Sequence, residues 1–501
     1  MEIKYDRLDV FLSAAMVLCG YCYWELGVCS EDQGAAVTLF TAMIVAITWT
    51  YLQMRGHRQS GRSLICVGIM GLLAASFMLF DGNCEHVFGF LTLQAVYVYW
   101  VAVTTGTRVE EGLSIYVIGD AIRQFFVIPL GNFFGCPASF ISGPKNKKIS
   151  RGVFAVIFGL IISVPLVFAV IYLLTTADSR FGVVMFHIFN IYDWNWTSYL
   201  LSFMLGLPVA FYLFGLVFGN VKGKNRDVLN KDSLAARAAK MKAMPAAITL
   251  TVMTVLNLIY TIFLVLQTSY LFSAFKNVLP DGMTYAEYAR SGFFQLCLVA
   301  VINFAVVAAA CSFSKSESIH SAMVLKVETA IMALFTIGLS ATAFRKMYMY
   351  IDAYGLTRLR VYTSLFLLFM ALTFAVIFAR QLRRFNGTRI VVILALVMML
   401  GFVYGNIDGH IARYNMARYE AGTMKLMDEN SMASLSGGAV PYIYEAYSRT
   451  DNARDKASMH FVLTGERKVK DGIESLEYKK LTWENWNLQA AKADELRSRV
   501  K

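Results

Sequence analysis

The sequence predicts an all-α membrane protein: a polytopic helical bundle of about eleven spans with a small C-terminal α-helical extracytoplasmic domain. Hydrophobic residues make up 57% of the 501 residues and charged residues only 16%, whereas a soluble domain carries about 25% charged residues. The charges fall in short clusters between long uncharged runs. Basic residues concentrate in alternate connections between those runs, as expected for loops that stay in the cytoplasm.

Each span needs ~20 apolar residues to cross roughly 30 Å of hydrocarbon. Two weaker spans are expected near 10–28, where Glu25 lies close to the end, and near 325–344, where Glu328 lies at the membrane edge. The clear uncharged runs are 33–54, 63–80, 86–107, 152–177, 194–221, 246–275, 291–314, 361–379 and 390–407.

The uncharged run 124–144 is not counted as a span. It is interrupted by Pro129 and Pro137, and a crossing there would place the strongly basic connection 222–245 outside, against the positive-inside rule. We therefore predict an interfacial or re-entrant segment on the inner side, and the sequence leaves these two alternatives open.

Eleven spans that start in the cytoplasm leave the C-terminus outside the membrane. The expected domains are a transmembrane helical domain at 1–407 and a small helical extracytoplasmic domain at 408–501. The second domain should contain a helix from Ile411, a second helix at 439–447 after Gly437-Gly438, and a last helix with Trp483, Trp486, Ala490 and Ala493 at helical spacing.

No pattern of a cofactor, metal or catalytic site is found in the sequence, which has no H-E-x-x-H, Walker A, G-x-S-x-G or G-x-G-x-x-G motif. The formal net charge of +12 is carried by a few loops between apolar runs. That placement favours contact with anionic lipid headgroups as partners and argues against nucleic acid.

Cys29 and Cys84 fall in short outer connections. An oxidising exterior would permit a disulfide between them, and the alternative is two free thiols.

Two outer connections, 277–292 and 345–360, suggest an anion site. One outer loop, 345–360, carries Arg345, Lys346, Arg358 and Arg360 against the single acid Asp352, contrary to the positive-inside rule. Arginines bind carboxylate and phosphate with two parallel hydrogen bonds. The hypothetical site comprises Tyr285, Glu287, Tyr288, Arg290, Asp352, Tyr354, Arg358 and Arg360. For the first four, the simpler alternative is a helix start capped by Thr284 and Glu287.

These loops resemble segments of a known family. The stretches Y-A-E-Y-A-R-S-G-F-F (285–294), Y-G-L-T-R-L-R-V-Y (354–362), I-A-R-Y-N-M-A-R-Y (411–419) and L-S-G-G-A-V-P (435–441) are similar to a bacterial multi-pass membrane family classed as a domain of unknown function, in the group numbered four-one-five-three and four-one-seven-three. The resemblance covers roughly 150–445. It implies the bacterial cytoplasmic (inner) membrane and no assigned reaction.

Three functions are compatible with these features. The favoured one is a non-enzymatic sensor, scaffold or envelope-associated protein that meets an envelope protein or an anionic ligand on its outer face. A transporter of an anionic or amphiphilic substrate would need broken helices, for which Pro165 and Pro208 are candidates. A membrane enzyme acting on a lipid-linked substrate would use Glu31 and Asp32 in the first outer loop, an interpretation by analogy alone.

Overall fold

The structure, a computed structural model, describes most of the chain in two compact units. The described residues are 4–28, 33–82, 84–110, 112–113, 116–142, 156, 159, 163, 167, 170–171, 173–178, 180–184, 195–223, 236, 239–240, 242, 244–275, 293–315, 318–424, 428–469, 472–475, 478 and 480–500. The fifth predicted span, 152–177, therefore lies largely outside them. Unit 1 comprises 1–111, 116–230 and 480–488, and unit 2 comprises 112–115, 231–479 and 489–501.

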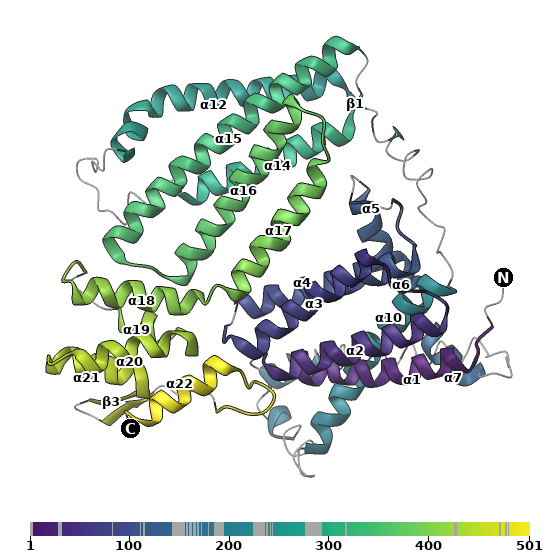
Figure 1. Ribbon diagram of the computed structural model, residues 1–501, viewed down its shortest axis with the longest axis horizontal. Helices are drawn as coiled ribbons and strands as arrows, with labels where there is room; N and C mark the ends of the chain where they lie inside the picture. The colour runs from purple at the N-terminus through teal and green to yellow at the C-terminus, as the bar shows by residue number, and fades with distance from the viewer. Residues whose placement is uncertain are drawn as a thin grey trace. The chain divides into compact units, whose positions relative to one another are not determined.

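Unit 1 is a bundle of apolar helices (Figure 1). Its long helices are α1 (Arg7–Cys22), continued by the π-helix η1 (Tyr23–Val28), α2 (Ala35–Met54), α3 (Gly61–Leu79), α4 (Cys84–Thr105) and α10 (Asn195–Val221). Helix α10 passes through Pro208 without a break in its assigned range. One of the two proline positions considered for a broken helix is thus helical, and Pro165 lies outside the described residues.

Helices α1 and α10 approach each other closely in unit 1. A Cβ atom on Gly20 would lie 2.3 Å from the carbonyl oxygen of Gly206, and one on Gly206 would lie 2.6 Å from that of Gly20. No real Cβ tolerates such distances, so both glycines are required for this backbone contact. Small residues that let helices approach closely are the usual basis of helix association in membranes.

The run 124–144 forms short helices that do not cross the bundle. They are α5 (Val117–Ile122), the π-helix η2 (Arg123–Val127), α6 (Ile128–Gly131) and α7 (Gly135–Ser142). The first three follow one another without a break over 117–131, which is about 22 Å of helix and shorter than the ~20 residues that a span needs. The backbone of Pro129 contacts α10 at Gly215, where an added Cβ would lie 2.3 Å from the Pro129 oxygen. This geometry agrees with the predicted non-spanning segment.

Unit 2 contains the remaining long helices and the C-terminal elements (Figure 1). The long helices are α12 (Ala246–Phe275), α14 (Phe293–Phe313), α15 (Ile319–Tyr354), α16 (Arg358–Leu382) and α17 (Gly387–Tyr404). Helix α15 packs against α12, α14 and α16. The two-residue strands β1 (Met244–Pro245) and β2 (Ser314–Lys315) pair in parallel beside the ends of α12 and α14.

The C-terminal elements of unit 2 form a small domain, which we call the C-terminal domain (407–479 and 489–501). It contains α18 (Ile407–Glu420), α19 (Glu429–Ala433), the 3-10 turn η4 (Gly437–Ala439), α20 (Val440–Arg449), α21 (Ala453–Thr464) and α22 (Leu488–Ser498), whose first residue lies in unit 1. An antiparallel hairpin of β3 (Glu466–Val469) and β4 (Gly472–Ser475) adds strands that the helical prediction did not contain.

The core of this domain continues into the membrane helices of unit 2. Its buried residues include Ile411, Ile443 and Leu463. Apolar side chains from α16 and α17, among them Tyr362 and Phe402, pack against the same cluster. The two compact units are not divided at 407/408, and the domain shares one hydrophobic core with the ends of α16 and α17.

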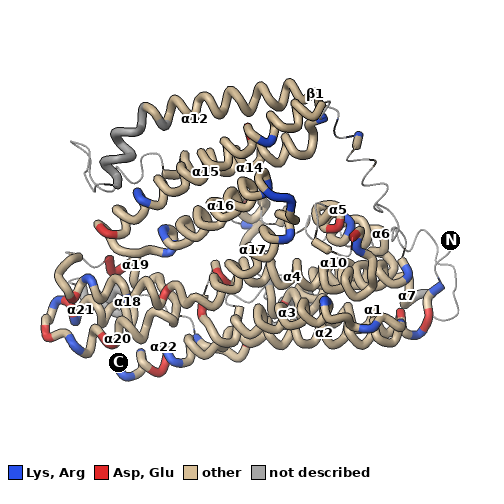
Figure 2. Tube along the Cα trace, turned by 45° about the horizontal axis from the view of Figure 1, so that its top comes forward, with Lys and Arg blue, Asp and Glu red and all other residues tan. Residues whose placement is uncertain are grey.

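The all-α membrane fold is confirmed. Among the described residues, ten helices are long and apolar enough to cross a membrane, and they match ten of the eleven predicted spans. In Figure 2 most of each long helix lacks charge, while α18, α20, α21 and α22 carry both signs. One local prediction is wrong: α22 begins at Leu488, so Trp483 and Trp486 lie before it in a loop rather than on its face.

Candidate functional site

The outer loop 345–360 lies against α18 of the C-terminal domain. Helix α15 ends at Gly355, whose φ of +77° is a conformation that favours glycine. The next residue, Leu356, exchanges two hydrogen bonds with the Asn415 side chain: its N–H donates to Oδ1 and its carbonyl accepts from Nδ2, both at 2.8 Å. A Cβ on Gly355 would lie 2.6 Å from that Oδ1. A glycine is therefore required at position 355 both by the positive φ at the helix end and by the close contact with Asn415.

Arg358, the first residue of α16, is paired with Asp408 near the start of α18. Its Nε donates to Oδ1 at 2.8 Å, and its Nη2 donates to Oδ2. The Ser436 N–H donates to the same Oδ2 at 2.8 Å. Asp408 is only 4% exposed, so this is a buried, two-pronged ion pair. The carboxylate that Arg358 binds belongs to the protein itself.

Arg360 is fixed by the end of α15. Its Nη1 donates to the carbonyl oxygens of Tyr354, at 3.1 Å, and Gly355, which are among the unsatisfied acceptors at a helix C-terminus. The guanidinium lies over the Tyr350 ring, 3.9 Å from its centroid. Among the described residues, no carboxylate forms an ion pair with Arg360.

Arg418 of α18 completes the contact between the loop and the domain. Its Nη1 donates to the Asp352 carbonyl at 2.6 Å and to the Ile351 carbonyl at 3.3 Å, and it lies 3.5 Å from the Asp352 carboxylate. We call Asp352, Leu356, Arg358, Arg360, Asp408, Asn415 and Arg418 the coupling cluster. It joins the end of α15 and the start of α16 to the C-terminal domain.

Half of the predicted outer site is thus brought together. Asp352, Tyr354, Arg358 and Arg360 lie at the junction of α15 and α16. Tyr285, Glu287, Tyr288 and Arg290 lie outside the described residues, as do Cys29, Glu31 and Asp32. Cys84 is exposed at the start of α4, and its pairing with Cys29 stays a prediction.

The partners in α18 were not predicted as site residues. Asn415 and Arg418 lie in the stretch 411–419, which was noticed only as a family resemblance. A signal was available, because an aspartate in the first turn of α18 suits the positive end of a helix and an arginine partner.

The C-terminal domain also carries a polar groove of about 520 Å³. It lies where α18 and α20 end and α21 begins, and it contains Glu420, Asp451 and Asp455. Arg449 also lines it but is paired with Glu445. Tyr419 donates a hydrogen bond of 2.6 Å to Asp455, and this bond raises the pKa of the Tyr419 phenol. The groove is therefore acidic in character.

Polar residues inside the bundle of unit 2 bond to one another. Nδ2 of Asn257 in α12 donates to the Glu328 carboxylate of α15 at 2.6 Å. Asn303 of α14 accepts from the Tyr260 hydroxyl at 2.5 Å and donates to Thr336 of α15 at 2.9 Å. These bonds tie α12, α14 and α15 together, as interhelical hydrogen bonds do in membranes.

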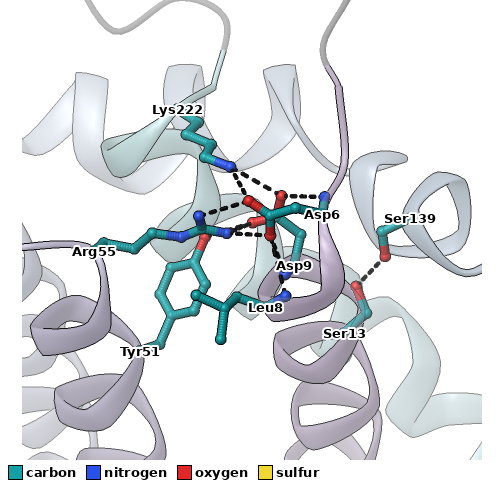
Figure 3. A network of polar contacts seen from close by, with 8 residues as sticks. All are labelled: Asp6, Leu8, Asp9, Ser13, Tyr51, Arg55, Ser139 and Lys222. Atoms are coloured by element: carbon teal, nitrogen blue, oxygen red, sulfur yellow. Dashed lines mark hydrogen bonds and ion pairs between the residues drawn. The ribbon is translucent and has the colours of Figure 1, made fainter. Parts of the chain in front are cut away.

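A charged network joins the start of α1 to the ends of α2 and α10 in unit 1 (Figure 3). Asp6 and Asp9 form a capping box at the start of α1. Arg55, after α2, binds both carboxylates. Lys222, after α10, lies 2.7 Å from Asp6 and 3.2 Å from Asp9. The Tyr51 hydroxyl donates to Asp9 at 2.8 Å.

This network has a structural role and was missed in the sequence. Arg55 and Lys222 lie in connections where the charge pattern alone predicts cations of cytoplasmic loops, but two carboxylates neutralise them, and the pairs tie α1, α2 and α10 together. The hydrogen bonds from Arg55 hold the pKa of the Asp6 carboxyl well below its usual range. The spacing Asp6-x-x-Asp9 before an apolar run is the signal that could have revealed it.

The fold and these contacts define a multi-pass helical membrane protein whose C-terminal domain is built onto the ends of its membrane helices. The chain belongs to the family described as Domain of unknown function (DUF4153), whose model matches residues 67–446. That match confirms the resemblance seen in the sequence and includes the coupling cluster. No curated protein and no solved structure matches the chain.

Proposed function

We propose that the protein is a non-enzymatic sensor or scaffold of the bacterial cytoplasmic membrane, with its N-terminus in the cytoplasm and its C-terminal domain outside. The observation that carries this proposal is the coupling cluster. A buried ion pair, a reciprocal amide contact and a shared hydrophobic core fix the domain to α15, α16 and α17. A protein that passes a signal or a load between the envelope and the membrane needs such a connection.

The acidic groove offers a contact surface for the partner. Its volume of about 520 Å³ is in the range of sites that hold a small molecule or a few side chains. Glu420, Asp451 and Asp455 suit a basic segment of an envelope protein, because complementary charge gives specificity and speeds encounter. The groove lies on the C-terminal domain and so on the outer face in this proposal.

The test compares a deletion strain with strains that express Asp408→Asn or the control Glu445→Gln. Asp408→Asn removes the charge that holds Arg358, while Glu445→Gln disturbs only an exposed ion pair on α20. We expect the deletion to alter the envelope-stress response. Asp408→Asn should reproduce this effect beyond what its loss of membrane abundance explains, and Glu445→Gln should behave as wild type.

Lipid and metabolite analysis of the same strains provides the contrary outcome. If the deletion strain accumulates a lipid-linked precursor and its stress response is normal, the protein is an enzyme or a transporter and the proposal is wrong. Asp408→Asn with normal abundance and a wild-type response would also contradict it, because coupling would then be dispensable.

A further inference from the structure

The outer ends of α14, α15 and α16 enclose a groove that the coupling cluster does not fill. It has a volume of about 40 Å³, and it is lined by Phe293, Phe294, Met347, Tyr350, Leu359, Arg360 and Thr363. The surface lining it is apolar, so Arg360 and Thr363 contribute carbon atoms to it. Phe293 and Met347 are buried at its base, whereas Phe294 and Leu359 are exposed.

The position of the groove along the helices places it at the membrane–water boundary. Phe293 and Phe294 begin α14, Tyr350 lies near the end of α15, and Arg360 lies in the first turn of α16. Tyrosines concentrate at that boundary, and arginines there direct their charged groups toward the headgroups. The apolar part of the groove therefore faces acyl chains, and its rim lies at phosphate level.

The guanidinium of Arg360 is held in an orientation suited to binding an anion at this rim. Its Nη1 is occupied by the Tyr354 and Gly355 carbonyls and its planar face by Tyr350, so the guanidinium is held in one orientation. In contrast to Arg358, it pairs with no carboxylate of the described residues. An arginine whose orientation is already fixed loses less entropy when it binds a phosphate.

We propose that this groove binds one anionic phospholipid, with the lipid phosphate on Arg360 and the upper part of an acyl chain between Phe294 and Leu359. The uncompensated charge of Arg360 favours an anionic headgroup over a zwitterionic one. The volume of about 40 Å³ has room for about three water-sized groups, which suits one or two methylene groups of a chain rather than a whole lipid. This inference does not depend on a sensor or scaffold role.

Native mass spectrometry of the purified full chain tests the proposal, with equal amounts of phosphatidylglycerol and phosphatidylethanolamine added in detergent. Wild type should retain one phosphatidylglycerol in preference. Arg360→Gln should reduce that retention roughly tenfold, the effect of losing one charge-assisted contact. The matched control is Arg345→Gln: Arg345 also lies toward the outer end of α15, but it stacks over Tyr348 and does not line the groove.

A second variant distinguishes a lipid from a free phosphate. Thr363→Phe fills the groove and leaves Arg360 in place, so it should also reduce lipid retention, and it remains informative if Arg360→Gln fails to fold. Unchanged retention in Thr363→Phe would show that the chain is not held in the groove and would overturn the lipid assignment. Equal retention by Arg360→Gln and wild type, or equal losses in Arg360→Gln and Arg345→Gln, would overturn the role of Arg360.

Discussion

Arg358 and Arg360 show what the sequence can and cannot reveal about single residues. Their unusual placement in an outer loop marked them as binding residues, and both do bind acceptors: a carboxylate for Arg358 and helix-end carbonyls for Arg360. The sequence could not identify those acceptors, because Asp408 is fifty residues away along the chain. A role of these arginines in binding an external anion stays a prediction, and the acceptors that they bind within the chain were not predictable.

The ion pair between Arg358 and Asp408 should contribute strongly to the stability of unit 2. Asp408→Asn keeps the shape of the side chain and an oxygen that accepts from the Ser436 N–H. It leaves the largely buried guanidinium of Arg358 without its counter-charge. We expect the free energy of unfolding to fall by about 3 kcal/mol, because breaking one side of a buried pair is costly. Thermal unfolding of the purified protein in detergent measures this. Glu445→Gln, in a pair with side chains 65% and 53% exposed, should change stability by less than about 1 kcal/mol.

At the scale of helices, hydropathy was sufficient to locate the spans but not their neighbours. The run 246–275 and helix α12 have the same bounds, and 33–54 differs from α2 by two residues. Length and apolarity alone determine whether a helix can cross the membrane. They carry no information about which helices touch, so the packing of α1 on α10 was not predicted.

Gly20 should be essential for that packing. Gly20→Ala would place a methyl group 2.3 Å from the Gly206 oxygen and force α1 and α10 apart, so the melting temperature should fall by several degrees. Gly71→Ala is the matched control, because Gly71 lies in α3 and an added Cβ there meets nothing within 4 Å. Alanine is also the better helix former, so the control should be neutral or slightly stabilising. A Gly20→Ala protein as stable as the control would show that the two helices can separate without cost.

At the scale of the whole chain, the contacts of the C-terminal tail segment 480–488 bear on how many times the chain crosses the membrane. The segment 480–488 belongs to unit 1, where it caps α2. The N–H of Ala35 donates to the Trp486 carbonyl at 2.9 Å, and that of Ala36 donates to the Glu484 carbonyl at 3.2 Å. Gly34 offers no side chain as a cap, and a Cβ there would lie 2.4 Å from the Asn485 backbone. We therefore expect the tail to lie on the same side of the membrane as the start of α2, an arrangement that requires an odd number of spans.

Labelling of single cysteines follows from this arrangement. In a cysteine-free background, Trp483→Cys should react with a membrane-impermeant maleimide in intact spheroplasts, because Trp483 is 60% exposed in the tail segment. Arg58→Cys, beyond the other end of α2, should react only after the membrane is permeabilised, since the 20 residues of α2 cover about 30 Å. In a double variant, Ala35→Cys and Trp486→Cys should be joined by a short bifunctional reagent. If both single cysteines react from the same side, the count of spans is wrong, and if Trp483→Cys reacts only after permeabilisation, the C-terminal domain is not extracytoplasmic. If they react as expected but the double variant is not crosslinked, the orientation stands and the cap on α2 does not.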